Sequence, residues 1–551
     1  MSPSRTSTRT WAKGGVLAAL WLASGTVLPL PKPVAFSDPH PQEARFLVLS
    51  ESCARCHSAV PTAQALWGST GQDASPLGTW RASVMANSFA DPYWRAQMER
   101  EVDLASEAGR PEVRELCTRC HAPAAVHEAR LGGDAAPTLA ALDADPAAHE
   151  GVTCTVCHRM NGEGFGEKKT FDGNLPLDLG ANLFGPYPEP FDGPMAAMSG
   201  YQIQYGEHVS TSALCATCHT LETGHGEARF LEQSPYLEWR NSVFSYESGE
   251  TEQSRSCQSC HMPNMGSMNI AHNPMGGDFP FLSPRPDVRS HAIVGGNALL
   301  LDLLRLGREE LGVRASAAEL EQMAQETRRQ LSQDTATVDL DEVEWFLDRL
   351  RFDVLVENLA GHKLPSGYPS RRMWLEVTVT TEDFPWFESG VPDAQGRIVE
   401  RGEDFGLVHH NTITSTEQVQ VYEMVAHDAE GHATTQLSAM QTLAKDNRLL
   451  PLGWAPAGPH GDQTSPVGIG QDEDFVGGGD IVHFDLEIPP EVQKLPGRPM
   501  IAVRLLYQSI PPGWADEHRG RKSEASQRFL RLYDAAPTRY EVLAETRRIA
   551  R

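Results

Sequence analysis

Residues 154–158 read Cys154-Thr-Val-Cys157-His158, and the C-x-x-C-H spacing of this stretch recurs four more times. The other copies are Cys53-Ala-Arg-Cys56-His57, Cys117-Thr-Arg-Cys120-His121, Cys215-Ala-Thr-Cys218-His219 and Cys257-Gln-Ser-Cys260-His261. Together the five copies use all ten cysteines of the 551-residue chain. The pattern therefore decides how the first half of the chain is interpreted.

The pentapeptide has the spacing of covalent haem attachment. Two thiols three positions apart lie on one face of a helical turn, where they can form thioethers with the two vinyl groups at one edge of a porphyrin. The histidine that follows points at the iron from the proximal side. The sequence predicts five haem c groups, bound by the ten motif cysteines and ligated by His57, His121, His158, His219 and His261.

Other cysteine chemistries explain the pattern less well. Zinc sites also use C-x-x-C pairs, but they do not require a histidine after every second cysteine. A thioredoxin-like redox pair would occur once, beside a βαβ pattern. Ten cysteines in an exported chain would ordinarily suggest five disulfides, but the repeated spacing with histidine favours haem.

The second axial ligand decides what each haem can do, because histidine there gives a low-potential electron carrier and an open position admits a substrate. Twenty histidines less the five of the motifs leave fifteen. Those interleaved with the motifs are the predicted iron ligands, namely His127, His149, His208 and His291, with His225 and His272 as weaker candidates. No histidine stands beside the first motif, where Met85 or Met98 is an alternative ligand, although methionine is more often core filler.

Net charge and the N-terminus restrict the class of protein. The formal net charge is −26, which disfavours nucleic acid as a partner and favours solubility. Arg5, Arg9 and Lys13 precede an apolar stretch over residues 16–30, which is short for a spanning helix. Residues 1–36 are predicted to be an export signal, with an uncleaved N-terminal anchor as the alternative. Export agrees with covalent haem attachment.

The rest of the chain divides into three predicted parts. Residues 37–294 hold all five motifs and are rich in proline and glycine, with a predicted loop over residues 180–200. Such a domain would use its haems as much of its core. Residues 295–335 form a predicted helical connector, because Leu299, Leu300, Leu303 and Leu304 recur at helical spacing and Ser316 opens a capping box.

Residues 336–551 change to strand patterns and contain no cysteine. The predicted strands cover residues 351–357, 374–380, 419–425, 480–486 and 500–506, which alternate or are β-branched and are separated by turn residues. We predict an α+β fold, in which a loop-rich, helical multihaem domain is followed by an antiparallel β-sandwich. Asp472, Glu473, Asp474 and Asp480 form an acidic loop that a calcium ion suits, although a solvated loop explains it as well.

Three further stretches resemble multihaem c-type cytochromes with a C-terminal β-domain. They are Trp80-Arg-Ala-Ser-Val-Met-Ala-Asn87 with Asp91-Pro-Tyr-Trp94, then Asn358-Leu-Ala-Gly-His362-Lys-Leu-Pro-Ser-Gly367-Tyr-Pro-Ser-Arg371-Arg372, and Val419-Gln-Val-Tyr-Glu423 with Lys445-Asp-Asn-Arg448-Leu-Leu-Pro451. With the motifs, the resemblance covers most of the chain after residue 36 and implies electron transfer. It adds His362 to the predicted ligands, because its tightly turned loop can place it on a haem of the first domain. The alternative is a turn histidine that bonds backbone.

The sequence thus predicts a pentahaem cytochrome that transfers single electrons between redox protein partners in the periplasm or at the cell surface, with a membrane-associated donor as a suitable partner. The alternative is an oxidoreductase with one five-coordinate haem, the first being the best candidate, that acts on a small nitrogen or sulfur substrate. No catalytic residue is predicted. Pentahaem nitrite reductases have the same haem count, but they characteristically carry a C-x-x-C-K motif and a helical C-terminal part, and this chain has no C-x-x-C-K.

Overall fold

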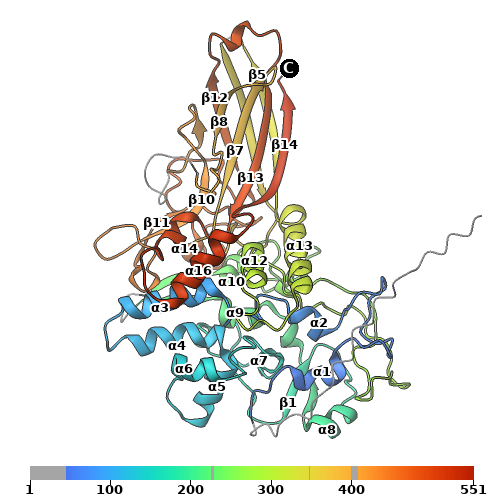
Figure 1. The fold of residues 1–551 in the computed structure, drawn as a ribbon. Helices are drawn as coiled ribbons and strands as arrows, with labels where there is room; N and C mark the ends of the chain where they lie inside the picture. The colour runs from blue at the N-terminus through green and yellow to red at the C-terminus, as the bar shows by residue number, and fades with distance from the viewer. Residues whose placement is uncertain (1–44, 225–228, 347, 399–407, 551) are drawn as a thin grey trace, which may run out of the picture. The chain divides into compact units, whose positions relative to one another are not determined.

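Proline and turn residues divide the first part of the chain into short helices (Figure 1, blue to green). The computed structural model describes residues 45–224, 229–346, 348–398 and 408–550, so the predicted export segment lies outside the described residues. The helices are α1 Glu51–His57, α2 Pro76–Trp80, α3 Pro92–Leu104, α4 Arg110–His121, α5 Pro123–Gly132, α6 Leu139–Ala144, α7 Cys154–His158, α8 Gly193–Ser199, α9 Ser212–His219, α10 Pro235–Arg240 and α11 Cys257–His261. Proline in the first turn opens six of them, α2 to α5, α8 and α10, where its missing N–H costs nothing.

The stretch predicted to be a helical connector contains two helices. Its leucines are buried in α12 Ala298–Leu306. The capping box predicted at Ser316 opens α13 Ala317–Gln333, with both of its reciprocal bonds to Glu319 present. Two glycines, Gly307 and Gly312, lie between the helices and allow the chain to turn.

Two sheets follow the connector. One has the order β5-β6-β12-β9, and the other has the order β11-β10-β7-β13-β14 with β8 also paired to β7. Their bounds are β5 Ala336–Trp345, β6 Arg349–Asn358, β7 Arg372–Thr381, β8 Phe384–Ser389, β9 Thr412–Ile413, β10 Val421–His427, β11 Thr442–Asp446, β12 Gly479–Glu487, β13 Met500–Gln508 and β14 Glu541–Ile549. Within these sheets only the short pair of β9 and β12 is parallel, so all five predicted strands and the antiparallel arrangement are confirmed.

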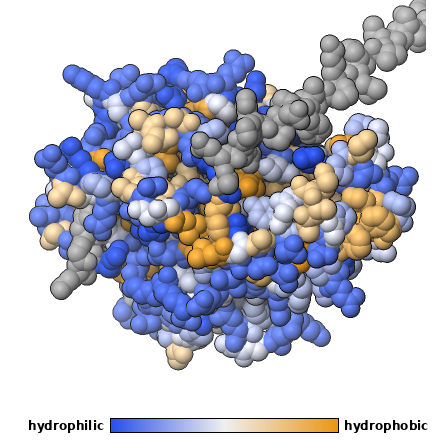
Figure 2. All heavy atoms as spheres, turned by 90° about the horizontal axis from the view of Figure 1, so that it is seen from below, coloured by the Kyte–Doolittle hydropathy of each residue, from blue (hydrophilic) through white to orange (hydrophobic). Residues whose placement is uncertain are grey.

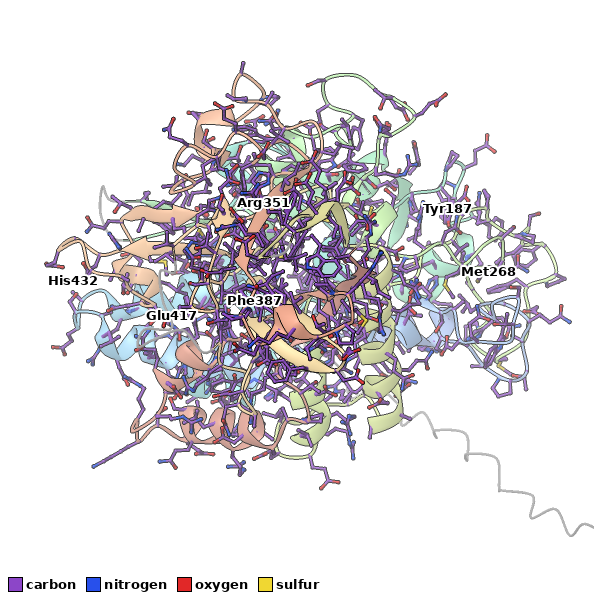
Figure 3. The ribbon with its side chains drawn as sticks, turned by 90° about the horizontal axis from the view of Figure 1, so that it is seen from above. Tyr187, Met268, Arg351, Phe387, Glu417 and His432 are labelled. Carbon is purple, nitrogen blue, oxygen red and sulfur yellow. The ribbon has the colours of Figure 1, made fainter. Side chains whose placement is uncertain are left out.

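Aromatic rings join the two sheets into a sandwich. Phe352 of β6 stacks on Phe484 of β12 with 4.6 Å between ring centroids. Phe387 of β8, in the other sheet, meets Phe484 edge-on at 6.2 Å. Seen from above in Figure 3, Arg351 and Phe387 lie near the centre of the view, over the sheets. The predicted α+β fold class is therefore confirmed.

Some elements differ from the prediction. The predicted loop over residues 180–200 contains α8 and the strand β1 Asn182–Gly185, which pairs in parallel with β2 Gln202–Tyr205. The C-terminal part also holds helices, α14 Gly461–Thr464, α15 Pro512–Asp516 and α16 Glu524–Ala535. Strand β14 escaped prediction because it is an edge strand, paired only with β13, and carries several charged side chains.

The helical and sheet parts pack against each other. Arg100 of α3 donates to Glu517 at 2.9 Å, and the Glu101 carboxylate accepts from the backbone N–H groups of Leu437 and Ser438 at 2.9 and 3.1 Å. Residues Phe46–Arg551 accordingly form one compact unit. The domain boundaries at residues 294 and 335 stay predictions.

The face seen from below is mostly hydrophilic, with apolar side chains gathered in patches (Figure 2). Phe191 and Phe281 are more than half exposed, and their rings are 5.0 Å apart. Nearby on the motif part, Tyr187 and Met268 share a small apolar cluster with Ala74, on one side of the view in Figure 3. Among the described residues no helix is long and apolar enough to cross a membrane.

The aromatic contact between the sheets predicts a large stability difference. Phe484 is 1% exposed, so Phe484→Ala should lower the free energy of unfolding of the protein by about 3–5 kcal/mol. Phe346→Ala is the control, because Phe346 is 51% exposed, and it should change stability by less than about 0.5 kcal/mol. Urea denaturation of both variants measures the difference. Equal losses would contradict the sandwich interior.

Candidate haem centres

Each C-x-x-C-H motif ends a helix, and the motif histidine is its last residue. Helices α7 and α11 consist of the motif alone. One helical turn places both sulfurs on the same side of the helix, as a two-point attachment requires. All ten cysteines are free, with nine partly exposed and Cys260 exposed, so no disulfide competes for them.

Four motif histidines are oriented by the same backbone contact. Nδ1 lies 2.8 Å from the Ile270 carbonyl in His57, 2.9 Å from that of Ser88 in His121, 2.7 Å from that of Phe184 in His158 and 2.6 Å from that of Val294 in His261. A carbonyl can only accept, so Nδ1 carries the proton and the Nε2 lone pair is left for a metal. Burial also lowers the pKa of these imidazoles, to about 4 in His121, which keeps them neutral.

Two motif histidines face a second imidazole. The ring centroids of His158 and His291 are 6.3 Å apart with 27° between the rings, and those of His261 and His362 are 6.2 Å apart with 12°. Two metal–nitrogen bonds of about 2 Å each, together with the distance from each centroid to its nitrogen, account for such a separation. Nδ1 of His291 and of His362 also contacts a backbone carbonyl, at 3.2 and 2.9 Å. Both pairs therefore fit an iron with two histidine ligands.

Comparison with known proteins agrees with this geometry. Residues 52–159, which include the first three motifs, match the family described as cytochrome c554 and c-prime. The chain is a multihaem c-type cytochrome. Its structure is similar to the crystal structure of a penta-heme cytochrome c552 from Thermochromatium tepidum, with a TM-score of 0.52 and 17% identity, over 91% of this chain and 99% of that chain. At this identity the likeness shows a shared fold. No curated protein matches the chain. Its function is electron transfer or redox chemistry at haem.

Three other predicted ligands of the cytochrome direct Nε2 at backbone instead. The Nε2 atoms of His127, His149 and His208 lie 3.0, 2.9 and 2.8 Å from the carbonyls of Gly173, Asp143 and Met160. Each would bind iron only through Nδ1, or after a rotation of its ring. Their ligand role stays a prediction. His225, a weaker candidate, lies outside the described residues.

His272, a weaker ligand candidate because it follows the fifth motif, lies beside the first motif instead. The backbone N–H of His272 donates to the Cys56 carbonyl at 3.0 Å, and the His272 charge contributes to lowering the pKa of His57, after burial. Nδ1 of His272 contacts the Asn273 carbonyl at 2.6 Å, whereas its buried Nε2 has no partner. Since 215 positions separate His272 from His57 in the numbering, no local pattern signals this contact. Of the two alternative ligands, Met98 is 1% exposed in α3, and Met85 is partly buried against the apolar cluster around Leu47.

Contacts between motif sulfurs link the haem centres to one another. Interaction with Cys154 raises the pKa of Cys53, interaction with Cys218 raises that of Cys120, and interaction with Cys257 raises that of Cys215, so the two sulfurs of each pair lie close together. In the haem-loaded protein these sulfurs are thioethers, so the contacts mark attachment points that lie side by side. Charge on Cys218 also raises the pKa of Cys157, after burial. The first motif thus adjoins the third, the third adjoins the fourth, and the fourth adjoins the second and the fifth.

Two acids lie close to the second motif, and two tyrosines lie close to one of these acids. Burial raises the pKa of Cys117 first, followed by the charges of Glu101 and Glu232. Glu232 and Tyr93 also act on Tyr368, whose pKa burial raises most. The two tyrosine hydroxyls are buried and interact with each other, and the buried Oε2 of Glu232 has no hydrogen-bond partner. Burial raises the pKa of Glu232 to about 7, so this carboxyl can hold a proton near neutral pH.

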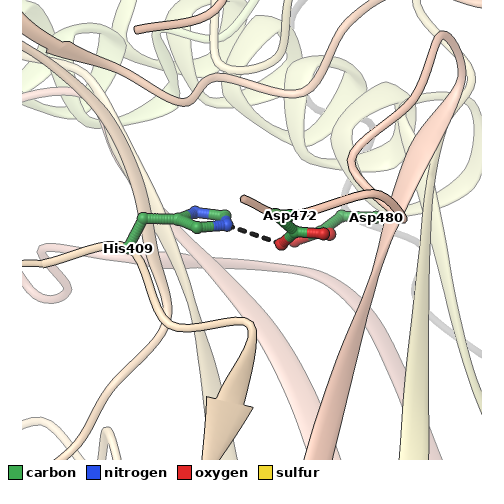
Figure 4. Close-up of side chains that lie close together, drawn as sticks. All are labelled: His409, Asp472 and Asp480. Carbon is green, nitrogen blue, oxygen red and sulfur yellow. Dashed lines mark hydrogen bonds and ion pairs between the residues drawn. The ribbon is translucent and has the colours of Figure 1, made fainter. Parts of the chain in front are cut away.

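Of the predicted acidic loop, only Asp472 and Asp480 come together, and they meet His409 from another segment (Figure 4). His409 Nε2 lies 2.8 Å from Asp472 Oδ2. The side-chain amide nitrogens of Gln420 and Asn447 each lie 2.9 Å from His409 Nδ1.

Both amide orientations are fixed, because Gln420 Oε1 accepts the His410 N–H at 2.8 Å and Asn447 Oδ1 accepts the Glu423 N–H at 3.0 Å. The amide nitrogens therefore donate to Nδ1 of His409, and its proton sits on Nε2, where it is donated to Asp472. Neither ring nitrogen has a lone pair for a metal. The cluster is a hydrogen-bond network within the sandwich.

Asp480 makes this network sensitive to pH. Its Oδ2 accepts from the Tyr422 hydroxyl at 2.8 Å, but its buried Oδ1 has no partner. Burial raises its pKa from 3.8 to about 7. As pH rises from about 4 to about 7, the unfolded chain loses this proton first, so folding stability falls, by roughly 4 kcal/mol at most.

Replacing Asp480 should remove this pH dependence. Asp480→Asn is expected to raise the melting temperature relative to the parent protein at pH 8, and to raise it much less at pH 5. Exposed Asp462 supplies the control Asp462→Asn, whose effect should be the same at both pH values. Thermal unfolding at the two pH values measures both. An Asp480→Asn effect that does not change with pH would contradict the prediction.

Proposed function

We propose that this cytochrome carries five haems and passes single electrons between redox proteins outside the cytoplasm. The observation that supports the proposal most strongly is the unbroken series of neighbouring attachment points, in which every motif adjoins at least one other. Haems bound at these points would lie close enough for electrons to move along the series. The chain needs no substrate site for this function.

The proposed coordination follows from the ring geometry. His158 and His291 hold the third haem, and His261 and His362 hold the fifth, because these rings face each other. His57 and His272 are assigned to the first haem, since the buried Nε2 of His272 has no partner. His127, His149 and His208 remain candidates for the second and fourth haems. Histidine on both sides of an iron gives a low-potential carrier.

The proposed location is the periplasm or the cell surface. The predicted export segment over residues 1–36 supports it, and so does the fact that haem c is attached covalently after export. The net charge of −26 favours partners that present a basic docking surface and disfavours nucleic acid. A membrane-associated electron donor suits an exported carrier.

Removing one facing histidine should open one haem. In the oxidised holoprotein, His291→Ala is expected to convert one iron in five from low spin to high spin, seen by low-temperature electron paramagnetic resonance. His432→Ala is the matched control, since its side chain is 80% exposed and it lies at the edge of the view in Figure 3. Unchanged low-spin signals in His291→Ala would contradict the assignment.

A second candidate function is favoured by the surroundings of the second motif. Glu232 brings a protonatable carboxyl to the neighbourhood of Cys117, and Glu232 in turn lies close to the buried hydroxyls of Tyr368 and Tyr93. Reduction of a small nitrogen or sulfur compound consumes protons as well as electrons. If one haem is five-coordinate, the structure therefore favours the second haem over the first, which has His272 beside it.

Ligand binding distinguishes the two functions. If the second haem is open, nitrite, hydroxylamine or sulfite should perturb a high-spin signal of the oxidised protein. That response should vanish when the second haem is removed by Cys117→Ser with Cys120→Ser. It should survive removal of the fifth haem by Cys257→Ser with Cys260→Ser. If all five irons are low spin and none of the three compounds changes their signals, the second function is contradicted and electron transfer alone remains.

A further inference from the structure

The loop between β6 and β7 carries His362 from the sandwich to the fifth motif. Its start is held by Asn358, whose side-chain amide donates to the His362 carbonyl at 2.9 Å and to the Leu449 and Leu450 carbonyls at 3.2 Å. Leu364 then exchanges two backbone hydrogen bonds with Leu449, at 2.9 and 2.8 Å. The backbone on both sides of His362 is therefore tied to the segment after β11.

Four charged side chains are buried beneath this loop. Lys363 Nζ lies 2.6 Å from Asp446 Oδ2, Arg448 Nε lies 2.7 Å from Asp446 Oδ1, and Arg448 Nη2 lies 3.1 Å from Glu238 Oε1. The side chains of Lys363 and Asp446 are 1% and 3% exposed, and those of Arg448 and Glu238 are 7% and 0% exposed. Two positive and two negative charges make this ion quartet neutral overall.

The ion quartet reaches the ligand through Lys363, the residue after His362. The Lys363 backbone N–H donates to Glu238 Oε2 at 3.0 Å, while the Lys363 carbonyl lies 2.9 Å from Nδ1 of His362. Glu238 thus holds the peptide group before Lys363, the carbonyl after it orients the imidazole, and the Lys363 ammonium is anchored on Asp446. Because Glu238 lies in α10 and Asp446 ends β11, the quartet joins the motif part to the sandwich at the position of His362.

A buried set of charges is an expensive way to stabilise a fold, since apolar side chains of similar size often do as well. Its advantage is that it fixes positions, because each buried charge must lie close to an opposite charge in a defined geometry. The quartet therefore suits a position where an imidazole must be held at a fixed distance from a partner ring, here His261 at 6.2 Å between centroids.

We propose that Glu238, Lys363, Asp446 and Arg448 are positioning residues, which hold His362 in place as the distal ligand of the fifth haem. The inference rests on the proposed coordination of that haem by His261 and His362. It makes the sandwich part of the redox centre, because the rigidity of the sandwich is transmitted to the iron through the ion quartet.

Spin state tests the proposal in the haem-loaded, full-length protein. Glu238→Gln and Asp446→Asn each leave the quartet with one unbalanced positive charge and nearly unchanged size. In each, at least half of the fifth haem should become high spin, and added imidazole should restore the low-spin signal by replacing the displaced His362. Glu376→Gln is the matched control, because Glu376 pairs with Arg504 on the sandwich at 2.8 Å, outside the ion quartet. It should leave every iron low spin.

His362→Ala separates this inference from the proposed coordination. If His362→Ala makes one iron in five high spin while Glu238→Gln and Asp446→Asn both stay low spin with five haems bound, the positioning role is overturned and the coordination stands. If His362→Ala itself stays low spin, the coordination of the fifth haem fails, and the positioning role fails with it. Haem count and melting temperature, measured on every variant, distinguish a displaced ligand from general unfolding.

Discussion

The hydrogen bond from Nδ1 of a motif histidine to a backbone carbonyl is the interaction on which the haem-bearing part depends. The carbonyls come from distant segments, since Ile270 lies 213 positions from His57 and Val294 lies 33 from His261. One bond therefore orients an iron ligand and also ties a short helix to another stretch of chain. Segments that would otherwise be loops, such as the one around Ile270, acquire a fixed place because a ligand is anchored on them.

The β-sandwich provides a large apolar interior of its own. Its core runs through both sheets, around Phe352 and Phe484. The motif part shares a second large cluster with the connector helices and α16, and is otherwise held by several small clusters of buried residues. A rigid domain of this kind can hold the residue at the end of an extended loop in a fixed position. The loop that carries His362 uses that rigidity, which explains why a domain without cysteine belongs to a cytochrome.

The sequence predicted those parts of the fold that depend on a few consecutive residues. The attachment motifs, the five alternating strands and the capping box at Ser316 each lie within a few consecutive residues, and the structure contains them at the predicted places. Edge strand β14 and helix α16 were missed, because the edge strand alternates weakly and α16 stands between two strands in a part read as all-β.

The ligand contacts were harder to predict, because they join residues far apart in the chain. His272 follows the fifth motif in sequence but lies beside the first, and only the tertiary fold brings them together. His291 and His362 were predicted as ligands for different reasons, one by its place after the motifs and the other by its turned loop, and in the structure each ring faces that of a motif histidine. The acidic loop looked suitable for calcium, yet the fixed amides of Gln420 and Asn447 show that His409 is engaged in hydrogen bonds.

Two of the attachment helices, α7 and α11, are only five residues long. Helices so short do not persist in water by themselves, so before folding these cysteines lie on flexible chain that an attachment enzyme can reach. Once the native carbonyl contacts form, the same sulfurs are held against neighbouring motifs. The cysteines of these two motifs are therefore most accessible for cofactor attachment while the polypeptide is still open.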